Sequence, residues 1–195
     1  MKKQDIIQAP MGEKTILLHT CCAPCSSAII EALIQNGITP VIYYCNPNIY
    51  PKEEYEIRKD ECTRYAEALG LEIIDADYDH EGWLQQMVGM ENEPERGGRC
   101  LKCFKLRLLR TAEYAQKRGI KVISTTLSSS RWKSLEQINE AGEWACGSIR
   151  QNEGDVIWWD RNWKKGGLQE RRLQILKEFD FYNQLYCGCE FSMRH

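Results

Sequence analysis

Short apolar runs alternate along this chain with longer stretches in which apolar residues recur at helical spacing. The apolar runs predict buried strands over residues 15–19, 41–45, 71–74 and 121–125, and a short fifth strand over 156–159. The periodic stretches predict helices over residues 24–35, 53–69, 82–88, 100–118, 134–146 and 168–180. Because strands and helices alternate, we expect an α/β fold with a doubly wound parallel sheet.

Such a sheet binds its ligands beyond the carboxyl ends of the strands, where the strand order reverses. Residues 21–25 directly follow the first predicted strand, and residues 128–131 follow the fourth. Cys100 and Cys103 open the helix that precedes this fourth strand. We therefore expect a cysteine-rich metal site at the carboxyl ends of the strands.

No internal repeat, low-complexity tract or linker interrupts the pattern. The 195 residues are therefore expected to form a single α/β metal-binding domain, 1–195, with a C-terminal Cys-x-Cys tail. Chain ends fray unless something ties them down, so that tail is expected to need the metal. The polar segment 1–14 and the lack of a run of about 18 apolar residues predict a cytoplasmic protein without membrane contact.

Ten cysteines are present, and seven of them fall into three tight groups. The groups are H-T-C-C-A-P-C with Cys21, Cys22 and Cys25, R-C-L-K-C-F with Cys100 and Cys103, and Y-C-G-C-E with Cys187 and Cys189. A chain of this length can bury a core without disulfides, and cytosolic thiols stay reduced. Clustered thiols in such a protein indicate metal or redox chemistry.

The number of clustered thiols exceeds the four that one zinc ion or one iron–sulfur cluster requires. Adjacent Cys21 and Cys22 are expected to point in different directions, so that two neighbouring metals share them. Three interpretations stay open on these grounds, namely an iron–sulfur centre with an extra metal, a zinc site, and redox thiols. Cys45, Cys62 and Cys146 stand alone and are expected to be packing residues.

Polar residues near the strand ends allow both a functional and a structural interpretation. His19 closes the first strand beside the thiols and is either a proton donor or a buried structural histidine. The serines at 128–130 either bind phosphate or ribose oxygens or cap the next helix. The tryptophans within 158–163 resemble a base-stacking surface, although such residues also fill cores.

Basic residues concentrate in two segments, although the net charge is only −2. Residues 96–118 carry +7 and residues 158–172 carry +3, so the rest of the chain carries −12. This asymmetry predicts a side that faces a polyanion, with a solvated helix face as the alternative. The candidate contacts are Lys102, Lys105, Arg107 and Arg110 on one predicted helix, and Arg131, Arg161, Lys164 and Lys165 outside it.

Taken together, the motifs resemble those of the QueH-type epoxyqueuosine reductases. The matching stretches are L-L-H-T-C-C-A-P-C, N-P-N-I-Y-P-x-x-E-Y, E-R-G-G-R-C-L-K-C-F-x-L-R-L, T-T-L-S-S-S-R-W-K and Y-C-G-C-E-F-S. The resemblance implies the fold of the adenine nucleotide alpha-hydrolase (HUP) group. In that group the first strand-to-helix loop is rich in glycine and cradles phosphate, whereas here it is Cys-Cys-Ala-Pro-Cys. We therefore expect no ATP chemistry.

The same resemblance implies the last step of queuosine synthesis, in which an epoxide on a modified wobble guanosine in tRNA is reduced to an alkene. It implies a 4Fe–4S cluster and an additional iron ion, with the seven clustered cysteines as ligand candidates. We expect a ferredoxin- or flavodoxin-like electron donor, protons from His19 or bound water, and tRNA contacts from the basic residues. A zinc-stabilised tRNA-binding module and a tRNA sulfur-transfer enzyme of the same fold are the alternatives.

Overall fold

The sheet has five parallel strands in the order β3-β2-β1-β4-β5. The strands are β1 (Thr15–Thr20), β2 (Thr39–Tyr44), β3 (Ile73–Asp75), β4 (Val122–Thr125) and β5 (Ile157–Trp158). This computed structural model describes residues 6–150 and 155–193, so the polar segment 1–14 is described only from Ile6 onwards. Each predicted strand is present, and the parallel pairing is confirmed.

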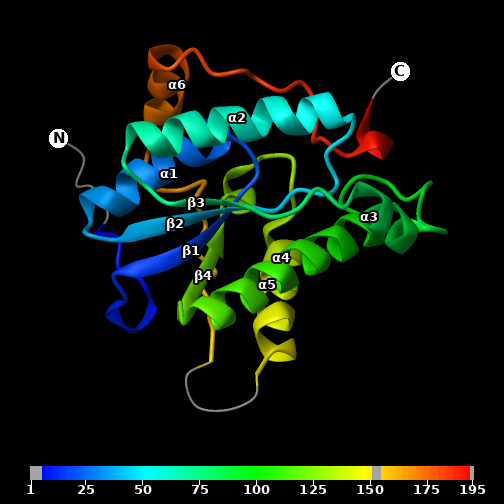
Figure 1. Ribbon diagram of the computed structural model, residues 1–195, viewed down its shortest axis with the longest axis horizontal. Coiled ribbons are helices and arrows are strands. Elements are labelled where there is room, and N and C mark those ends of the chain that lie inside the picture. The colour runs from blue at the N-terminus through cyan, green and yellow to red at the C-terminus, as the bar shows by residue number, and fades with distance from the viewer. Residues whose placement is uncertain (1–5, 151–154, 194–195) are drawn as a thin grey trace.

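Helices cover both faces of this sheet (Figure 1). They are α1 (Ala23–Gln35), α2 (Lys52–Ala68), α3 (His80–Met87), α4 (Gly98–Arg118), α5 (Leu135–Ser148) and α6 (Leu168–Glu178). Helices α1, α2 and α6 lie on one side, and α4 and α5 lie on the other (Figure 1). The doubly wound α/β class is therefore confirmed, while the HUP assignment stays a prediction.

The central strand β1 contains the apolar run 16–18, and its position in the fold explains that run. Ile16 and Leu18 pack into the core under α1 and α2, whereas Leu17 packs into the second core with Leu108 and Ile138. Successive side chains of a strand point to opposite faces, so a strand covered on both faces has apolar residues at successive positions rather than at alternate ones. The short apolar runs in the sequence therefore reflect strands that are buried on both faces.

Helix and strand boundaries differ from the predicted ones by a few residues. Strand β3 begins two residues later than predicted. Helix α3 begins two residues earlier, because the Asp79 carboxylate accepts a hydrogen bond from the Gly82 backbone N–H and caps the helix. Helix α1 starts at Ala23, with Pro24 in its first turn as expected. Three short 3-10 helices, Pro10–Gly12, Thr126–Ser129 and Glu190–Ser192, were not predicted.

The strand order reverses between β1 and β4, which lie side by side at the centre of the sheet. Near their carboxyl ends His19 pairs with Thr125. The loops after these two strands, together with the segment 181–193 that returns to this edge, form one region. An antiparallel bridge between Ile49 and Cys189 ties that segment to the loop after β2. The predicted position of the site, at the carboxyl ends of the central strands, agrees with this arrangement.

No helix within residues 6–150 and 155–193 is both long enough and apolar enough to cross a membrane.

Candidate metal centre

Three thiols converge in the loop between β1 and α1. The sulfur atoms of Cys21, Cys22 and Cys25 all lie within 4.8 Å of one another, and the first two are 3.8 Å apart. The expectation that Cys21 and Cys22 point in different directions was wrong. Cys22 has an extended backbone at the helix N-cap, and the turn into α1 brings the neighbouring sulfurs together. This group could hold a metal ion.

The loop after β4 positions this first group of thiols. The Cys21 backbone N–H donates to Thr126 Oγ1 at 3.4 Å, and the Ser129 hydroxyl donates to the Cys25 carbonyl at 3.2 Å. Ser128 donates to the carbonyls of Thr125 and Arg161. Because these hydroxyls are used within the protein, the structural interpretation of the serines is favoured over phosphate binding.

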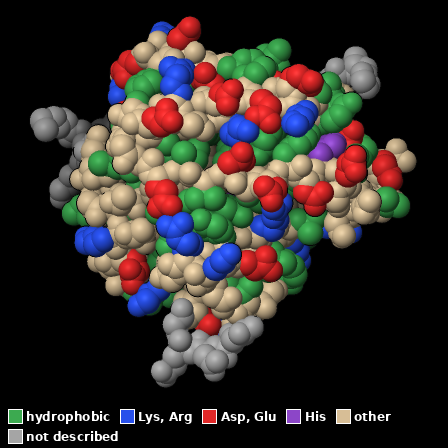
Figure 2. Space-filling view, in the orientation of Figure 1, with side chains coloured by type: hydrophobic (Ala, Val, Ile, Leu, Met, Phe, Trp, Pro, Cys, Tyr) green, Lys and Arg blue, Asp and Glu red, His purple; other side chains and the backbone are tan. Residues whose placement is uncertain are grey.

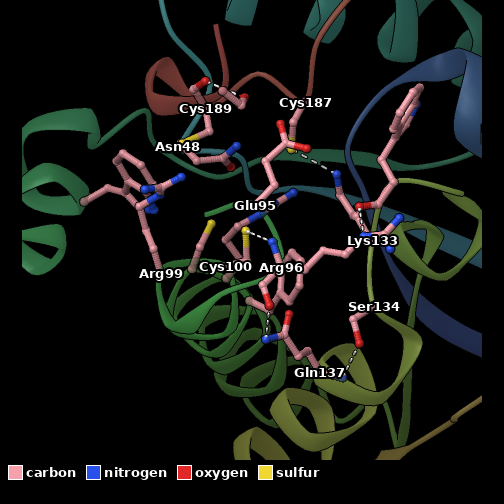
Figure 3. Close-up of a pocket in the computed structure, with 16 residues that line it drawn as sticks. Asn48, Glu95, Arg96, Arg99, Cys100, Lys133, Ser134, Gln137, Cys187 and Cys189 are labelled. Carbon is pink, nitrogen blue, oxygen red and sulfur yellow. Dashed lines mark hydrogen bonds between the residues drawn. The ribbon is translucent and has the colours of Figure 1, made fainter. Parts of the chain in front are cut away.

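Four further cysteines line one pocket beside α4 (Figure 3). Cys100 and Cys103 lie in the first turns of α4, three residues apart and therefore on one face of the helix. Cys187 and Cys189 come from the C-terminal segment and line the same pocket. Cys103 packs against Trp83 and is only 7% exposed. The three sequence groups thus form a site of three sulfurs and a pocket with four.

The pocket wall also carries buried polar atoms without a hydrogen-bond partner among the described residues. These atoms are Asn48 Oδ1, Trp83 Nε1, Arg99 Nε and Gln137 Oε1. Folded proteins rarely leave buried polar atoms unpaired, so their gathering indicates a pocket built to hold something. Four thiols together with such groups fit a metal cofactor and a polar ligand next to it.

Lys133 connects the pocket to the loop after β4. Its ammonium donates a hydrogen bond to Cys187 Sγ at 3.0 Å (Figure 3). Burial by itself would lower the pKa of Lys133, but Cys187 and Cys21 raise it above its ordinary value. Burial would likewise raise the pKa of Cys187, but Lys133 and Arg107 lower it. Lys133 therefore favours the thiolate form of Cys187.

The C-terminal Cys-Gly-Cys segment is held by a buried ion pair. Arg58 is 3% exposed, pairs with Glu54 at 2.6 Å, and donates to the carbonyls of Tyr186 and Cys187 at 3.2 and 3.3 Å. The Tyr50 backbone N–H donates to the Gly188 carbonyl at 2.8 Å. The tail therefore has protein partners, in contrast to the expectation that only the metal holds it.

Comparison with known proteins bears on this site directly. A family model described as "Epoxyqueuosine reductase QueH" matches residues 16–195. The chain belongs to the QueH family. The "Epoxyqueuosine reductase QueH" of Histophilus somni is 47% identical over 188 residues, which cover 96% of this chain and 76% of that protein. The protein of that name from Thermotoga maritima is 33% identical over 182 residues, which cover 92% of this chain and 90% of the relative.

The histidine at the end of β1 in this QueH-family chain is buried, and both of its ring nitrogens have partners. His19 is fully buried, with Nδ1 2.7 Å from Thr125 Oγ1 and Nε2 3.0 Å from the Cys45 carbonyl. Burial, and next the charge of Arg107, lower its pKa to about 3. These contacts and the lowered pKa favour the structural interpretation of His19, and its role as a proton donor stays a prediction.

The low pKa of His19 has a measurable consequence for stability. The unfolded chain binds a proton at this residue below about pH 6.5, whereas the folded chain does not do so until about pH 3. The metal-free protein is therefore expected to lose about 2 kcal/mol of unfolding free energy between pH 7 and pH 5 through this group. Urea unfolding of wild type and of His19→Gln at pH 7 and pH 5 measures this change in unfolding free energy. An equal pH dependence in both proteins would contradict this account.

The predicted nucleic-acid contacts fall into different environments. Arg107 is 2% exposed and donates to the Cys45 carbonyl and to Asn46 Oδ1, so its assignment to an exposed tRNA-binding face is corrected. Lys105 pairs with Glu140 at 2.7 Å. The half-buried or exposed candidates are Lys102, Arg110, Arg131, Arg161, Lys164 and Lys165.

The tryptophans predicted for base stacking lie largely in the core. Trp163 is 1% exposed and Trp159 is 7% exposed, which favours the packing interpretation. The exposed tryptophans are instead Trp132 and Trp144, and the Arg131 guanidinium lies 4.7 Å from the ring centroid of Trp132. Trp132 lines the thiol pocket, so it is the better placed to meet a base.

The three isolated cysteines are packing residues, as predicted. Cys62 is 3% exposed and belongs to the core under α1 and α2, whereas Cys45 and Cys146 belong to the core on the other side of the sheet. Burial raises the pKa of the Cys146 thiol to about 12 and that of the Cys45 thiol to about 11. These thiols are protonated at neutral pH and are poor metal ligands.

Proposed function

We propose that this protein reduces the epoxide of epoxyqueuosine at the wobble position of tRNA to queuosine. The observation that carries the proposal is the convergence of three thiols in the loop after β1 and of four thiols in one pocket, in a chain that belongs to the QueH family. We further propose that the chain acts as a single domain in the cytoplasm, where thiols stay reduced.

The cofactors that we propose are a 4Fe–4S cluster and an additional iron ion. The donor set fits them, because seven thiols exceed the requirement of one centre and they lie in two neighbouring groups. The ligand candidates are Cys21, Cys22, Cys25, Cys100, Cys103, Cys187 and Cys189. Bound there, these groups supply single-electron transfer and a Lewis acid for an oxygen atom.

The surrounding residues prepare the pocket for this chemistry. Trp83, Met87 and Phe191 pack around Cys103 and Cys189 and exclude water from one side. Lys133 and Arg107 place positive charge beside the thiolates. The balanced reaction consumes the epoxide, two electrons and two protons, and it yields the alkene and water. We propose that a reduced ferredoxin- or flavodoxin-like protein supplies the electrons and that water supplies the protons.

The tRNA-binding surface that we propose is made of half-buried or exposed basic residues. It comprises Lys102, Lys105, Arg110, Arg131, Arg161, Lys164 and Lys165. On the face shown in Figure 2, basic and acidic side chains are interspersed rather than gathered. A large, uniformly basic surface is therefore not what would bind tRNA on that face. We propose that binding relies on individual cationic side chains together with contacts to the modified base.

Charge reversal on α4 tests this surface. Changing both Lys102 and Arg110 to Glu is expected to weaken tRNA binding about tenfold or more and to reduce its salt dependence, because phosphate contacts release counterions. The measurement is a binding titration at several salt concentrations. Lys117→Glu, at the far end of the same helix, is the matched control. If the double variant bound tRNA like wild type, this part of α4 would be only a solvated face.

The reaction itself is tested with metal-loaded, reduced protein under anaerobic conditions. The substrate is tRNA that carries epoxyqueuosine, and mass spectrometry of the nucleosides is expected to show the loss of one oxygen without added ATP. No conversion by protein that contains its full iron and sulfide would overturn the proposal. Zinc as the sole metal in anaerobic preparations would favour the alternative of a tRNA-binding module.

A further inference from the structure

Four cationic side chains line the thiol pocket, and the hydrogen bonds of three of them are directed to protein oxygens. Arg96 donates to the carbonyls of Arg131 and Trp132. Arg99 donates through Nη1 to three carbonyls of the loop 90–93. Arg107 donates to the Cys45 carbonyl and to Asn46. Each guanidinium is fixed by the chain and holds that part of the wall in place.

Lys133 differs from these arginines in the partner of its charged group. Its ammonium meets a thiol sulfur of the site itself, Cys187 Sγ, at 3.0 Å. Figure 3 shows this ammonium at the edge of the pocket, next to Cys187 and on the side of the loop after β4. The rest of the residue is anchored, because its backbone N–H reaches the Ser130 carbonyl and its own carbonyl accepts from Lys164.

A lysine in this position can serve more than one acceptor. An ammonium has three N–H donors, and a thiolate that gives a lone pair to a metal is a weaker acceptor than a free one. At least one donor can then turn toward a ligand in the pocket. The reaction creates a suitable acceptor, because negative charge develops on the epoxide oxygen as its bond to carbon breaks.

We propose that Lys133 is a catalytic residue that donates a hydrogen bond to the epoxide oxygen and stabilises its negative charge. The inference rests on the proposed function and names a residue for it. The two C–O bonds break, a C=C bond forms, and the oxygen leaves as water. Two electrons from the reduced ferredoxin- or flavodoxin-like donor and two protons from water complete the balance. Lys133 contributes a fixed charge and no net proton.

The competing role for Lys133 is purely structural, as a partner that keeps Cys187 in place. Two variants separate the roles. Lys133→Met removes the charge and every donor while it keeps much of the side-chain volume, and Lys133→Arg retains a donating cation. Lys177→Met, on the exposed end of α6, is the control for loss of one lysine elsewhere.

The first measurement is single-turnover reduction of epoxyqueuosine in tRNA by reduced, metal-loaded protein. Lys133→Met is expected to slow the step about 10² to 10³-fold at saturating tRNA, with iron content and absorption spectrum unchanged. Lys133→Arg is expected to recover at least a tenth of the wild-type rate. A wild-type rate in Lys133→Met, or a loss that merely follows a loss of iron, would overturn the inference.

The second measurement needs no turnover. Without reductant, wild-type protein is expected to bind tRNA with the epoxide about tenfold more tightly than tRNA with the alkene, since a hydrogen bond from a charged group to the oxygen is present only in the first. Lys133→Met is expected to lose much of this preference for the epoxide. Wild-type protein without activity would overturn the proposed function. If wild type is active and both proteins show the same ratio of affinities for the epoxide and the alkene, only the role of Lys133 would be overturned.

Discussion

Replacing Cys103 by alanine is expected to lower epoxide reduction more than about a hundredfold and to reduce the bound iron. Partners that only support a metal ligand already cost tenfold to a hundredfold when they are changed, so the ligand itself must cost more. Cys103 is 7% exposed in the pocket wall and packs against Trp83, so its sulfur is held in a fixed position. Iron analysis and the turnover of epoxyqueuosine in tRNA measure the two effects.

The matched control for this variant is Cys146→Ala. Cys146 is 5% exposed and as deeply buried as Cys103, but it lies on α5, packs into the second core and does not line the pocket. Its replacement is expected to cost on the order of 1 kcal/mol of stability and to leave iron content and turnover unchanged. Full iron and full activity in Cys103→Ala would remove this residue from the ligand set.

Substituting Gly188 by alanine is expected to displace the Cys-Gly-Cys segment and to empty much of the metal site. Gly188 has φ +104°, which side chains of L-residues rarely adopt, at a cost of about 1–3 kcal/mol. An added Cβ would lie 2.9 Å from Arg58 Nη1 and 3.0 Å from Ile49 Cγ1. Arg58 and Ile49 are two of the residues that hold this segment in place, so relief of the clash must shift Cys187 and Cys189 together.

Limited proteolysis and iron analysis test this expectation. The variant is expected to be cleaved faster within residues 182–193 and to retain less iron than wild type. Gly147→Ala is the control, because nothing lies within 4 Å of a Cβ at that position and alanine favours a helix. Unchanged protection of the segment together with unchanged iron would show that the anchor does not depend on Gly188.

The sequence allowed the fold class and the location of the site to be predicted for identifiable physical reasons. Strand β1 must be apolar on both faces, so it appears as a continuous run, and the helices repeat their apolar residues at regular spacing. A thiol group directly follows β1, and in a sheet of this kind that position is the carboxyl edge. The order of the strands was not predicted, because it depends on pairing between distant runs.

The supporting residues of the site were missed because they stand far from the thiols in sequence. Arg58 precedes Cys187 by 129 residues, and Lys133 precedes it by 54. A single charged residue creates no periodic pattern, so nothing in the neighbouring sequence distinguishes a buried charged residue from a solvated one. Arg107 was a different case, since it follows Cys103 by four residues and therefore shares its helix face. That spacing would have been sufficient to predict Arg107 in the wall of the pocket rather than on the tRNA-binding surface.

The division of the site between distant segments also determines when it can be assembled in the cell. Ribosomes extend chains at about 5–20 residues per second, so Cys187 follows Cys25 by on the order of 10 to 30 seconds. During this interval the first three thiols lack the last two cysteines, and for its earlier part they also lack Lys133. The pocket with four thiols can be loaded only after synthesis has passed residue 189, and nascent chains are exposed to oxidants at Cys21, Cys22 and Cys25 until the site is complete.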